Sequence, residues 1–235
     1  MPWREIEEVL LDMDGTLLDL AFDNHFWTRL LPQRFAAARG LTEAEALAEL
    51  QPIFARTRGS LDWYCTDFWS RQTGLDVAAL KREVAHEVRL LPETAAVLER
   101  LRAAGKRLWL VTNAHPATLA IKLERAPIRH FFERIVSSHA LGAPKERRAF
   151  WEGLQARYPF ARQAALFVDD SVPVLQAAHD FGIAHVVAAG WPDRSQTPRA
   201  HDGFPSVRTL DELLPADTGD QNEKDPPRDE TGPFA

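Results

Sequence analysis

The sequence is poor in cysteine, in positive charge and in long apolar runs. Its single cysteine, Cys65, excludes an intramolecular disulfide and suits a reducing compartment. The formal net charge of −6 argues against broad attraction to nucleic acid or to an anionic membrane. No stretch approaches the roughly 20 apolar residues of a membrane helix, and the mixed, charged N-terminus lacks the apolar run of a signal peptide. We therefore expect a soluble, cytoplasmic protein without a nucleic-acid or membrane partner.

The composition is otherwise that of a globular protein, with 45% hydrophobic residues in a chain of 235. This length allows one large domain or a domain with a smaller insertion. Residues 22–90 are typical of such an insertion, because apolar residues recur there at helical spacing and no strand pattern interrupts them. The expected helices, separated at glycines, are 22–39, 42–57, 60–72 and 76–89. We predict a helical cap domain over residues 22–90, inserted after the first strand.

From residue 91 onward, strand and helix patterns alternate. This rhythm predicts an α/β fold with a Rossmann-like parallel sheet covered by helices on both faces. The core domain would comprise residues 1–21 and 91–214, and the Pro- and acid-rich segment 215–235 is predicted to be disordered. The expected strands are 9–11, 107–112, 134–137, 164–168 and 184–188; the expected helices are 91–104, 116–125, 145–158, 172–181 and 210–214.

Two carboxylates directly follow the first strand. Asp12 and Asp14 lie two residues apart beyond the apolar run 9–11, at the carboxyl end of the strand, where open α/β sheets bind their ligands. Paired carboxylates beside a buried strand repel each other and need a cation or a shared proton, which favours a site over an ordinary acidic turn. Gly15 lets the chain leave the strand in a conformation that a side chain would resist.

Other polar residues stand at similar positions. Thr112 ends the strand 107–112 and Asn113 follows it, and both offer hydrogen-bond donors to an anion, although a helix cap or a turn has the same pattern. Lys145 is expected at the start of a helix, where a cation is unfavourable without an anionic partner; a solvated surface lysine is the alternative. Asp169 and Asp170 follow the strand 164–168, and adjacent side chains face apart.

These positions together resemble the four signatures of the haloacid dehalogenase superfamily, a group of aspartate-nucleophile phosphohydrolases. The first signature is similar to residues 12–16, Asp-Met-Asp-Gly-Thr, and the second to Thr112. The third is similar to Lys145, and the fourth to the pair Asp169 and Asp170. The resemblance extends over about residues 9–182, in the order that the family has.

The resemblance implies a catalytic role for each of these residues. Asp12 would attack phosphorus to form an aspartyl-phosphate, and Asp14 would protonate the leaving oxygen and then activate water. Thr112, the backbone amide of Asn113 and Lys145 would bind the phosphate. Because an ordinary Asp is a weak proton donor at neutral pH, we expect the pKa of Asp14 to be raised by acidic neighbours or by desolvation.

The resemblance also implies Mg²⁺ as the cofactor. Its ligands would be the carboxylates of Asp12 and Asp170 and the backbone carbonyl of Asp14, a set of oxygen atoms that suits this ion. Asp169 would be an outer partner that orients the metal or the lysine. The family's longer fourth signature has a further acid, but residues 172–175 supply none.

Five further stretches look like the bacterial GMP/IMP nucleotidase subfamily, which implies a purine 5′-monophosphate as the small-molecule substrate. Asp23 and Asn24 would then contact the ribose or a base edge. Trp27, Trp63 and Tyr64 either stack the base or form the core of the cap, and the sequence favours neither. The stretches are 18–24, 26–27, 63–65, 112–116 and 122–124.

Two other functions are compatible with the sequence. A sugar-phosphate phosphatase or a phosphomutase would use the same residues on another substrate. A non-catalytic binding protein on this fold is the alternative of a different class, and the presence of both Asp12 and Asp14 argues against it. No pattern indicates an oligomeric state.

Overall fold

The computed structural model describes residues 1–199, 201 and 203–214; the segment 215–235, predicted to be disordered, lies outside the described residues. Its centre is a six-stranded sheet of order β3-β2-β1-β4-β5-β6, in which every neighbouring pair is parallel. The two-residue strand β6 was not predicted, because so short a segment carries no periodicity. The strands are β1 (Glu8–Leu11), β2 (Arg107–Thr112), β3 (Arg134–Ser137), β4 (Ala165–Asp169), β5 (His185–Ala189) and β6 (Ser206–Val207).

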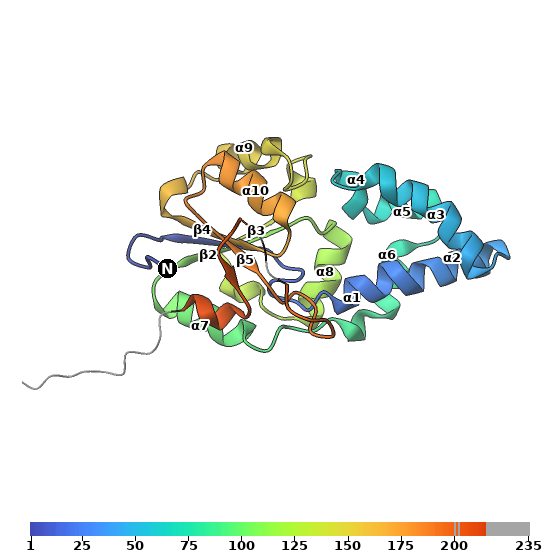
Figure 1. Ribbon diagram of the computed structural model, residues 1–235, viewed down its shortest axis with the longest axis horizontal. Helices are drawn as coiled ribbons and strands as arrows, with labels where there is room; N and C mark the ends of the chain where they lie inside the picture. Colours follow the sequence, from blue (N-terminus) through green and yellow to red (C-terminus); the bar gives the residue numbers. More distant parts are fainter. Residues whose placement is uncertain (200, 202, 215–235) are drawn as a thin grey trace, which may run out of the picture.

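Helices cover both faces of the sheet. Figure 1 shows α9 and α10 on one side of the strands and α7 on the other. Side chains of β1 pack on both faces of the sheet. Val9 and Leu11 belong to the hydrophobic cluster that includes α7, and Leu10 belongs to the cluster that includes α9 and α10. Residues 9–11 of this strand are apolar, as the sequence indicated for a strand buried on both faces, whereas Glu8 at its start is buried and pairs with Arg107. These helices are α7 (Thr94–Ala103), α8 (Pro116–Arg125), α9 (Arg148–Arg157) and α10 (Val172–Phe181).

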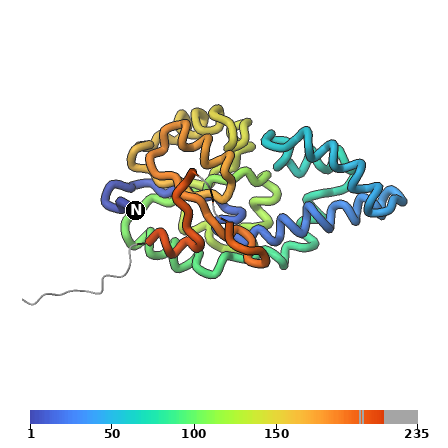
Figure 2. Tube along the Cα trace, in the orientation of Figure 1, coloured from blue at the N-terminus to red at the C-terminus, as the bar shows by residue number. Residues whose placement is uncertain are grey.

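The segment between β1 and α7 is helical and extends away from the sheet (Figure 2, blue to cyan). Its entrance and exit are hydrogen-bonded to each other: the N–H of Asp19 donates to the carbonyl of Arg89, and that of Leu91 to the carbonyl of Leu17. The helices are α1 (Ala21–His25), a π-helical turn (Phe26–Leu30), α2 (Leu31–Arg39), α3 (Glu43–Thr57), α4 (Leu61–Tyr64), α5 (Thr66–Thr73), α6 (Val77–Glu83) and a 3₁₀ turn (Ala85–Glu87).

Two of the expected helices are interrupted. The prediction of one helix over 60–72 is wrong, because Cys65 adopts an extended conformation and its sulfur accepts the backbone N–H of Phe68, which starts α5. The expected helix 76–89 ends at Glu83 and continues as the 3₁₀ turn. The last expected helix, 210–214, is a 3₁₀ segment (Leu210–Leu213); others are Arg129–Phe131, Ser138–Ala140 and Arg162–Ala164.

The predicted fold class is confirmed: a Rossmann-like parallel sheet carries a helical insertion after its first strand. The boundaries 1–21, 22–90 and 91–214 stay a prediction. Within the described part of the chain, every helix is too short or too polar to cross a membrane.

The central strand provides a test of how the core is packed. Leu10 is 0% exposed, so Leu10→Ala leaves a cavity, and we expect the free energy of unfolding in urea to fall by about 2–5 kcal/mol. Leu47→Ala is the matched control, since this leucine is 37% exposed on α3 and its loss should change stability by no more than about 0.5 kcal/mol. Equal effects of the two substitutions would contradict this packing.

Candidate active site

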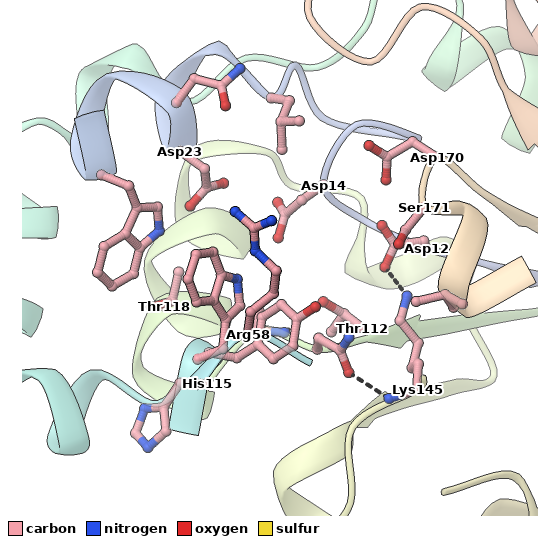
Figure 3. A pocket seen from close by; sticks show the side chains of 18 of the residues that line it. Asp12, Asp14, Asp23, Arg58, Thr112, His115, Thr118, Lys145, Asp170 and Ser171 are labelled. Carbon is pink, nitrogen blue, oxygen red and sulfur yellow. Dashed lines mark hydrogen bonds and ion pairs between the residues drawn. The ribbon is translucent and has the colours of Figure 1, made fainter. Parts of the chain in front are cut away.

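Three carboxylates meet where β1 and β4 end. The strands pair in register, with Leu11 opposite Val168, so the residues that follow them, Asp12 and Asp169, lie side by side. Asp12, Asp169 and Asp170 each offer a carboxylate oxygen, and these oxygens lie within 4.8 Å of one another. Figure 3 shows Asp12 and Asp170 on the same side of a cavity. The predicted convergence of the strand-end acids is therefore present.

Lys145 connects two of these acids. Its Nζ donates to Asp12 Oδ1, to Asp169 Oδ2 at 2.7 Å and to the carbonyl of Val111 at 3.1 Å. The side chain is only 2% exposed. Although burial opposes the charged form, Asp12 and Asp169 outweigh it and raise the pKa of Lys145. The lysine is thus a permanent cation, and the anionic partners expected for it are these two carboxylates.

The expected position of Lys145 within a helix is wrong. The helix α9 begins at Arg148, three residues later. The backbone of Lys145 is held in the preceding loop because its N–H donates to Asn113 Oδ1 at 2.9 Å and its carbonyl accepts Trp151 Nε1 at 2.8 Å. Contacts between distant segments, not a helix end, therefore orient this lysine.

The carboxylates carry more negative charge than Lys145 balances. Burial raises the pKa of Asp12 to about 6, with Lys145 acting against it. Burial also raises the pKa of Asp170 well above its usual range, and the neighbouring Asp169 and Asp12 raise it further. Among the described residues, Asp170 has no ion-pair partner. Several carboxylate oxygens with an unbalanced negative charge are ligands of the kind that a hard divalent cation such as Mg²⁺ prefers.

Gly15 allows Asp170 to approach this close. Its φ of 82° lies in the left-handed region, and a Cβ built on it would come within 2.7 Å of Asp170 Oδ2 and 2.8 Å of Pro192 Cβ. Any larger residue would push the loop after β1 away from the acid. The glycine is therefore required both for the turn and for the carboxylate cluster.

Asp14 belongs to a second group of charges. Its Oδ1 accepts Lys122 Nζ at 2.6 Å, and the same nitrogen donates to Asp23 Oδ2 at 2.5 Å. Lys81 Nζ donates to the other oxygen of Asp23 at 2.9 Å. Burial raises the pKa of Asp14 to about 6, against the effect of Lys122, and Asp23 and Asp12 raise it further. The expectation of a raised pKa for Asp14 therefore agrees with its surroundings.

The predicted substrate contacts in the helical region have protein partners. Burial would raise the pKa of Asp23, but Lys122 and Lys81 lower it to about 2, so this carboxylate is an anion between two cations. Asn24 Nδ2 donates to Asp193 Oδ2 at 2.7 Å. Both residues line the cavity, and both are also part of the contacts that hold α1 in place.

The candidate phosphate-binding residues lie at the end of β2. Thr112 is buried and its Oγ1 accepts the N–H of Ala114 at 3.0 Å. Asn113 Nδ2 donates to Glu146 Oε2 at 3.0 Å, and the other oxygen of Glu146 accepts the hydroxyl of Tyr64 at 2.5 Å. The helical region is therefore hydrogen-bonded to the sheet through a carboxylate beside the site.

A cavity of about 930 Å³ extends from the carboxylates to the helical region. Its far wall is aromatic and includes Trp27, Phe54, Trp63 and Tyr64. The two interpretations of these residues are compatible, since Trp27 and Trp63 line the cavity and also pack against the cluster around the buried Trp69. The volume is within the range of about 300–1,000 Å³ that is usual for small-molecule sites.

Three cations at the cavity were not predicted as site residues, although Lys122 lies in the stretch 122–124 that resembles the nucleotidase subfamily. Arg58 follows α3, lies 5.9 Å from the ring centre of Trp63 and reaches over the cavity in Figure 3. Its side chain has no hydrogen bond or ion pair with the described residues. Lys81 and Lys122 are buried, and only the lack of exposure identifies them. No local pattern distinguishes these three from ordinary surface cations of a helix.

Comparison with known proteins agrees with this geometry. A model of the family "haloacid dehalogenase-like hydrolase" matches residues 6–182. The GMP/IMP nucleotidase YrfG of Escherichia coli (strain K12) is 38% identical over 214 residues, which cover 91% of this chain and 96% of the relative. The phosphoglycolate phosphatase of Nitrosospira multiformis is 28% identical over 188 residues, covering 77% and 82% of the two chains.

Solved structures have the same fold. The HAD phosphatase from Thermococcus onnurineus superposes with a TM-score of 0.74 at 24% identity and covers 88% of this chain and 96% of its own. The L-2-haloacid dehalogenase from Xanthobacter autotrophicus gives a TM-score of 0.60 at 18% identity, covering 88% and 96%. The strand-end acids, the lysine between them and the matched family model lead to one conclusion: this chain is a hydrolase of the haloacid dehalogenase-like family.

Proposed function

We propose that the protein is a Mg²⁺-dependent phosphatase that hydrolyses purine nucleoside 5′-monophosphates, in particular GMP and IMP. The observation that carries the reaction type is the pair Asp12 and Asp14, two carboxylates that face one cavity but have different lysine partners. A haloacid dehalogenase attacks carbon and has no need of a second aspartate at this position. The name of the E. coli relative supports the choice of substrate.

Asp12 is the nucleophile in this proposal. Lys145 holds its Oδ1, which leaves Oδ2 outside the ion pair and directs the carboxylate. Attack of Oδ2 on phosphorus forms the Asp12–phosphate bond as the bond to the nucleoside 5′-oxygen breaks in line. Lys145 offsets the negative charge of both reactants, which would otherwise repel each other.

Asp14 moves the protons. It donates one to the departing 5′-oxygen, and its raised pKa of about 6 keeps a fraction of the group protonated near neutral pH. The resulting carboxylate then takes a proton from the water that attacks the phosphorus of the aspartyl-phosphate. Inorganic phosphate leaves, the Asp12 carboxylate is restored and Asp14 is protonated again, so the protons balance over one turnover.

Mg²⁺ would be held by the carboxylates of Asp12 and Asp170 and by the backbone carbonyl of Asp14. When bound, it supplies positive charge that offsets the near-dianion of a phosphate monoester. Asp169 accepts Lys145 at Oδ2 and the N–H of Ser171 at Oδ1, at 2.7 and 2.8 Å, and so orients the lysine. The Thr112 hydroxyl and the backbone amide of Asn113 hold the remaining phosphate oxygens.

The aromatic wall of the cavity would receive the purine. Trp27 and Trp63 offer ring faces, and stacking of a base on an aromatic side chain is worth about 1–3 kcal/mol. Arg58 is the polar group on this wall that suits the bases of GMP and IMP, because a guanidinium donates two hydrogen bonds to acceptors such as O6 and N7. Adenine presents an amino donor in place of O6.

Phosphoglycolate and other small phosphomonoesters are the second candidate substrates. The relative from N. multiformis is a phosphoglycolate phosphatase by name, and the catalytic end of the cavity would serve either substrate. The large aromatic wall favours the nucleotide, since a two-carbon acid would leave most of the cavity unfilled.

Phosphate release from a substrate panel tests the proposal. With Mg²⁺ we expect faster turnover of GMP and IMP than of pyrimidine monophosphates, sugar phosphates or phosphoglycolate. Asp12→Asn should reduce the rate at least about a thousandfold, because the nucleophile is lost. Asp180→Asn, at an exposed site on α10, should retain the rate. Faster turnover of small phosphomonoesters would refute the nucleotide assignment, and a loss of less than about tenfold in Asp12→Asn would refute the mechanism.

Metal dependence is tested at Asp170. A chelator should abolish phosphate release, and added Mg²⁺ should restore it. Asp170→Asn should raise the Mg²⁺ concentration required for half-maximal activity by at least about tenfold, because it removes one charged ligand. Asp180→Asn should leave the requirement unchanged. Full activity in chelator would contradict a metal-dependent reaction.

Base selectivity is tested at Arg58. Arg58→Met should raise KM for IMP by about tenfold, the loss expected for one pair of hydrogen bonds to a base, and should leave kcat and the KM for AMP nearly unchanged. Arg56→Met is the matched control, two residues earlier on α3, where the side chain pairs with Gln72 and does not line the cavity. An equal rise in KM for IMP and AMP would mean that Arg58 does not read the base.

A further inference from the structure

A second cluster of metal-ligating side chains lies apart from the carboxylates. Cys65 stands between α4 and α5, His115 precedes α8, and His139 is in the 3₁₀ turn after β3. All three are partly buried, and each offers a ligand atom within 4.8 Å of those of the other two. The cluster therefore joins the helical region to two strand ends of the sheet.

The imidazoles of His115 and His139 pack against each other, and one ring nitrogen of His139 has no hydrogen-bond partner in the described part of the chain. Their rings meet edge to face, with 4.8 Å between centroids and an angle of 81°. His139 Nε2 is buried from solvent and has no hydrogen-bond partner among the described residues. Buried polar atoms are nearly always paired, so this ring nitrogen, beside a thiol and a second imidazole, is available to a ligand.

Both histidines are in the protonation state that a metal requires. Burial lowers the pKa of His139 to about 4, assisted by His115, and burial also lowers the pKa of His115. The N–H of Ala117 donates to His115 Nδ1 at 3.3 Å, so this nitrogen bears the lone pair of the neutral ring. Neutral imidazoles are ligands, whereas imidazolium ions are not.

The surroundings favour a cation. Asp67 Oδ2 lies 3.8 Å from His115 Nε2, the nitrogen that carries the proton when Nδ1 is the ligand. At this distance the carboxylate accepts no hydrogen bond, but its negative charge favours a cation at the cluster. Asp62 and Asp67 are also close enough to act on His139, and the Sγ of Cys65 already accepts the N–H of Phe68 at 3.4 Å.

We propose that Cys65 Sγ, His115 Nδ1 and a ring nitrogen of His139 form a site for a borderline transition-metal ion of the Zn²⁺ class. One thiolate and two imidazoles are a ligand set that zinc accepts in tetrahedral geometry, with the fourth position open to water. To bind, the Cys65 thiol releases its proton to solvent. His115 Nδ1 exchanges its contacts with Thr66 Oγ1, at 2.7 Å, and with the N–H of Ala117, at 3.3 Å, for the metal. Mg²⁺ prefers oxygen ligands and would not compete here.

Occupancy of this site would fix one wall of the substrate cavity. Tyr64 and Trp63 directly precede Cys65 and line that cavity, as does His115. A metal bound to Cys65 and to His115 and His139, which follow β2 and β3, would hold α4 and α5 against the core. The site would therefore stabilise the folded chain without contributing a catalytic group.

Co²⁺ and Zn²⁺ binding to the metal-free full-length protein tests the proposal without any turnover. Co²⁺ should give the visible bands of a tetrahedral complex and a thiolate charge-transfer band, and Zn²⁺ should displace it. Zn²⁺ at a hundredfold excess over Kd should raise Tm by at least about 3 °C. Cys65→Ser and His139→Gln should each weaken Zn²⁺ binding by at least about tenfold.

Two controls separate this site from others. His179→Gln alters an exposed histidine on α10, and Asp170→Asn alters the carboxylate cluster; both should retain the thiolate band. Because Cys65 is the single cysteine, its alkylation in the unmodified protein gives a measurement that does not depend on a variant folding. Zn²⁺ should slow this alkylation at least about tenfold. An unchanged alkylation rate, or Co²⁺ binding without the thiolate band, would overturn the proposal.

Discussion

The buried ion pairs of Lys145 are the interaction on which the site depends. Moving a single charge into a protein interior costs several kcal/mol, and an ion pair is tolerated there only when hydrogen bonds satisfy its remaining atoms. Here Asp12, Asp169 and the carbonyl of Val111 all accept from the one ammonium group, so it ties together the ends of β1, β4 and β2. Removal of either charge sign would leave the other buried and uncompensated, which typically costs about 3–5 kcal/mol. The carboxylates can therefore be gathered at the sheet edge because the lysine is there.

A second ionic chain gives Asp14 a different environment from Asp12. Lys122 bridges Asp14 to Asp23, and Lys81 continues the chain into α6, so the helical region is attached to the same loop that carries the two aspartates. The chain is buried at both lysines. Asp12 and Asp14 thus have separate cations, Lys145 and Lys122, while burial raises the pKa of both carboxyl groups to about 6.

The sequence predicts the acids better than it predicts the cations. Asp12, Asp14 and Asp169, together with Thr112, could be located because they lie at or just after the carboxyl ends of buried strands, and these ends share one edge of a parallel sheet. Lys145 was inferred from a helix dipole, yet α9 starts three residues later and hydrogen bonds from distant segments hold the lysine. Arg58 had no local signal, and Lys122 was noted only within a stretch that resembles the nucleotidase subfamily, because the surroundings of both form only when the helical region packs against the sheet. The break at Cys65 has the same origin, because helical periodicity does not register a cap formed by a sulfur.

The aromatic residues of the helical region explain how chemistry and selectivity are divided along the chain. Several short helices enclose little volume, and large rings such as Trp69 and Phe26 are fully buried between them. Trp27 and Trp63 pack on this core from one side and face the cavity with the other, so the same residues that stabilise the helices also shape the wall. Substitutions on that wall would alter which leaving group fits without disturbing the ion pairs at the ends of β1 and β4. In the function proposed above, the carboxylate cluster would therefore determine the reaction and the helical insertion would select its substrate.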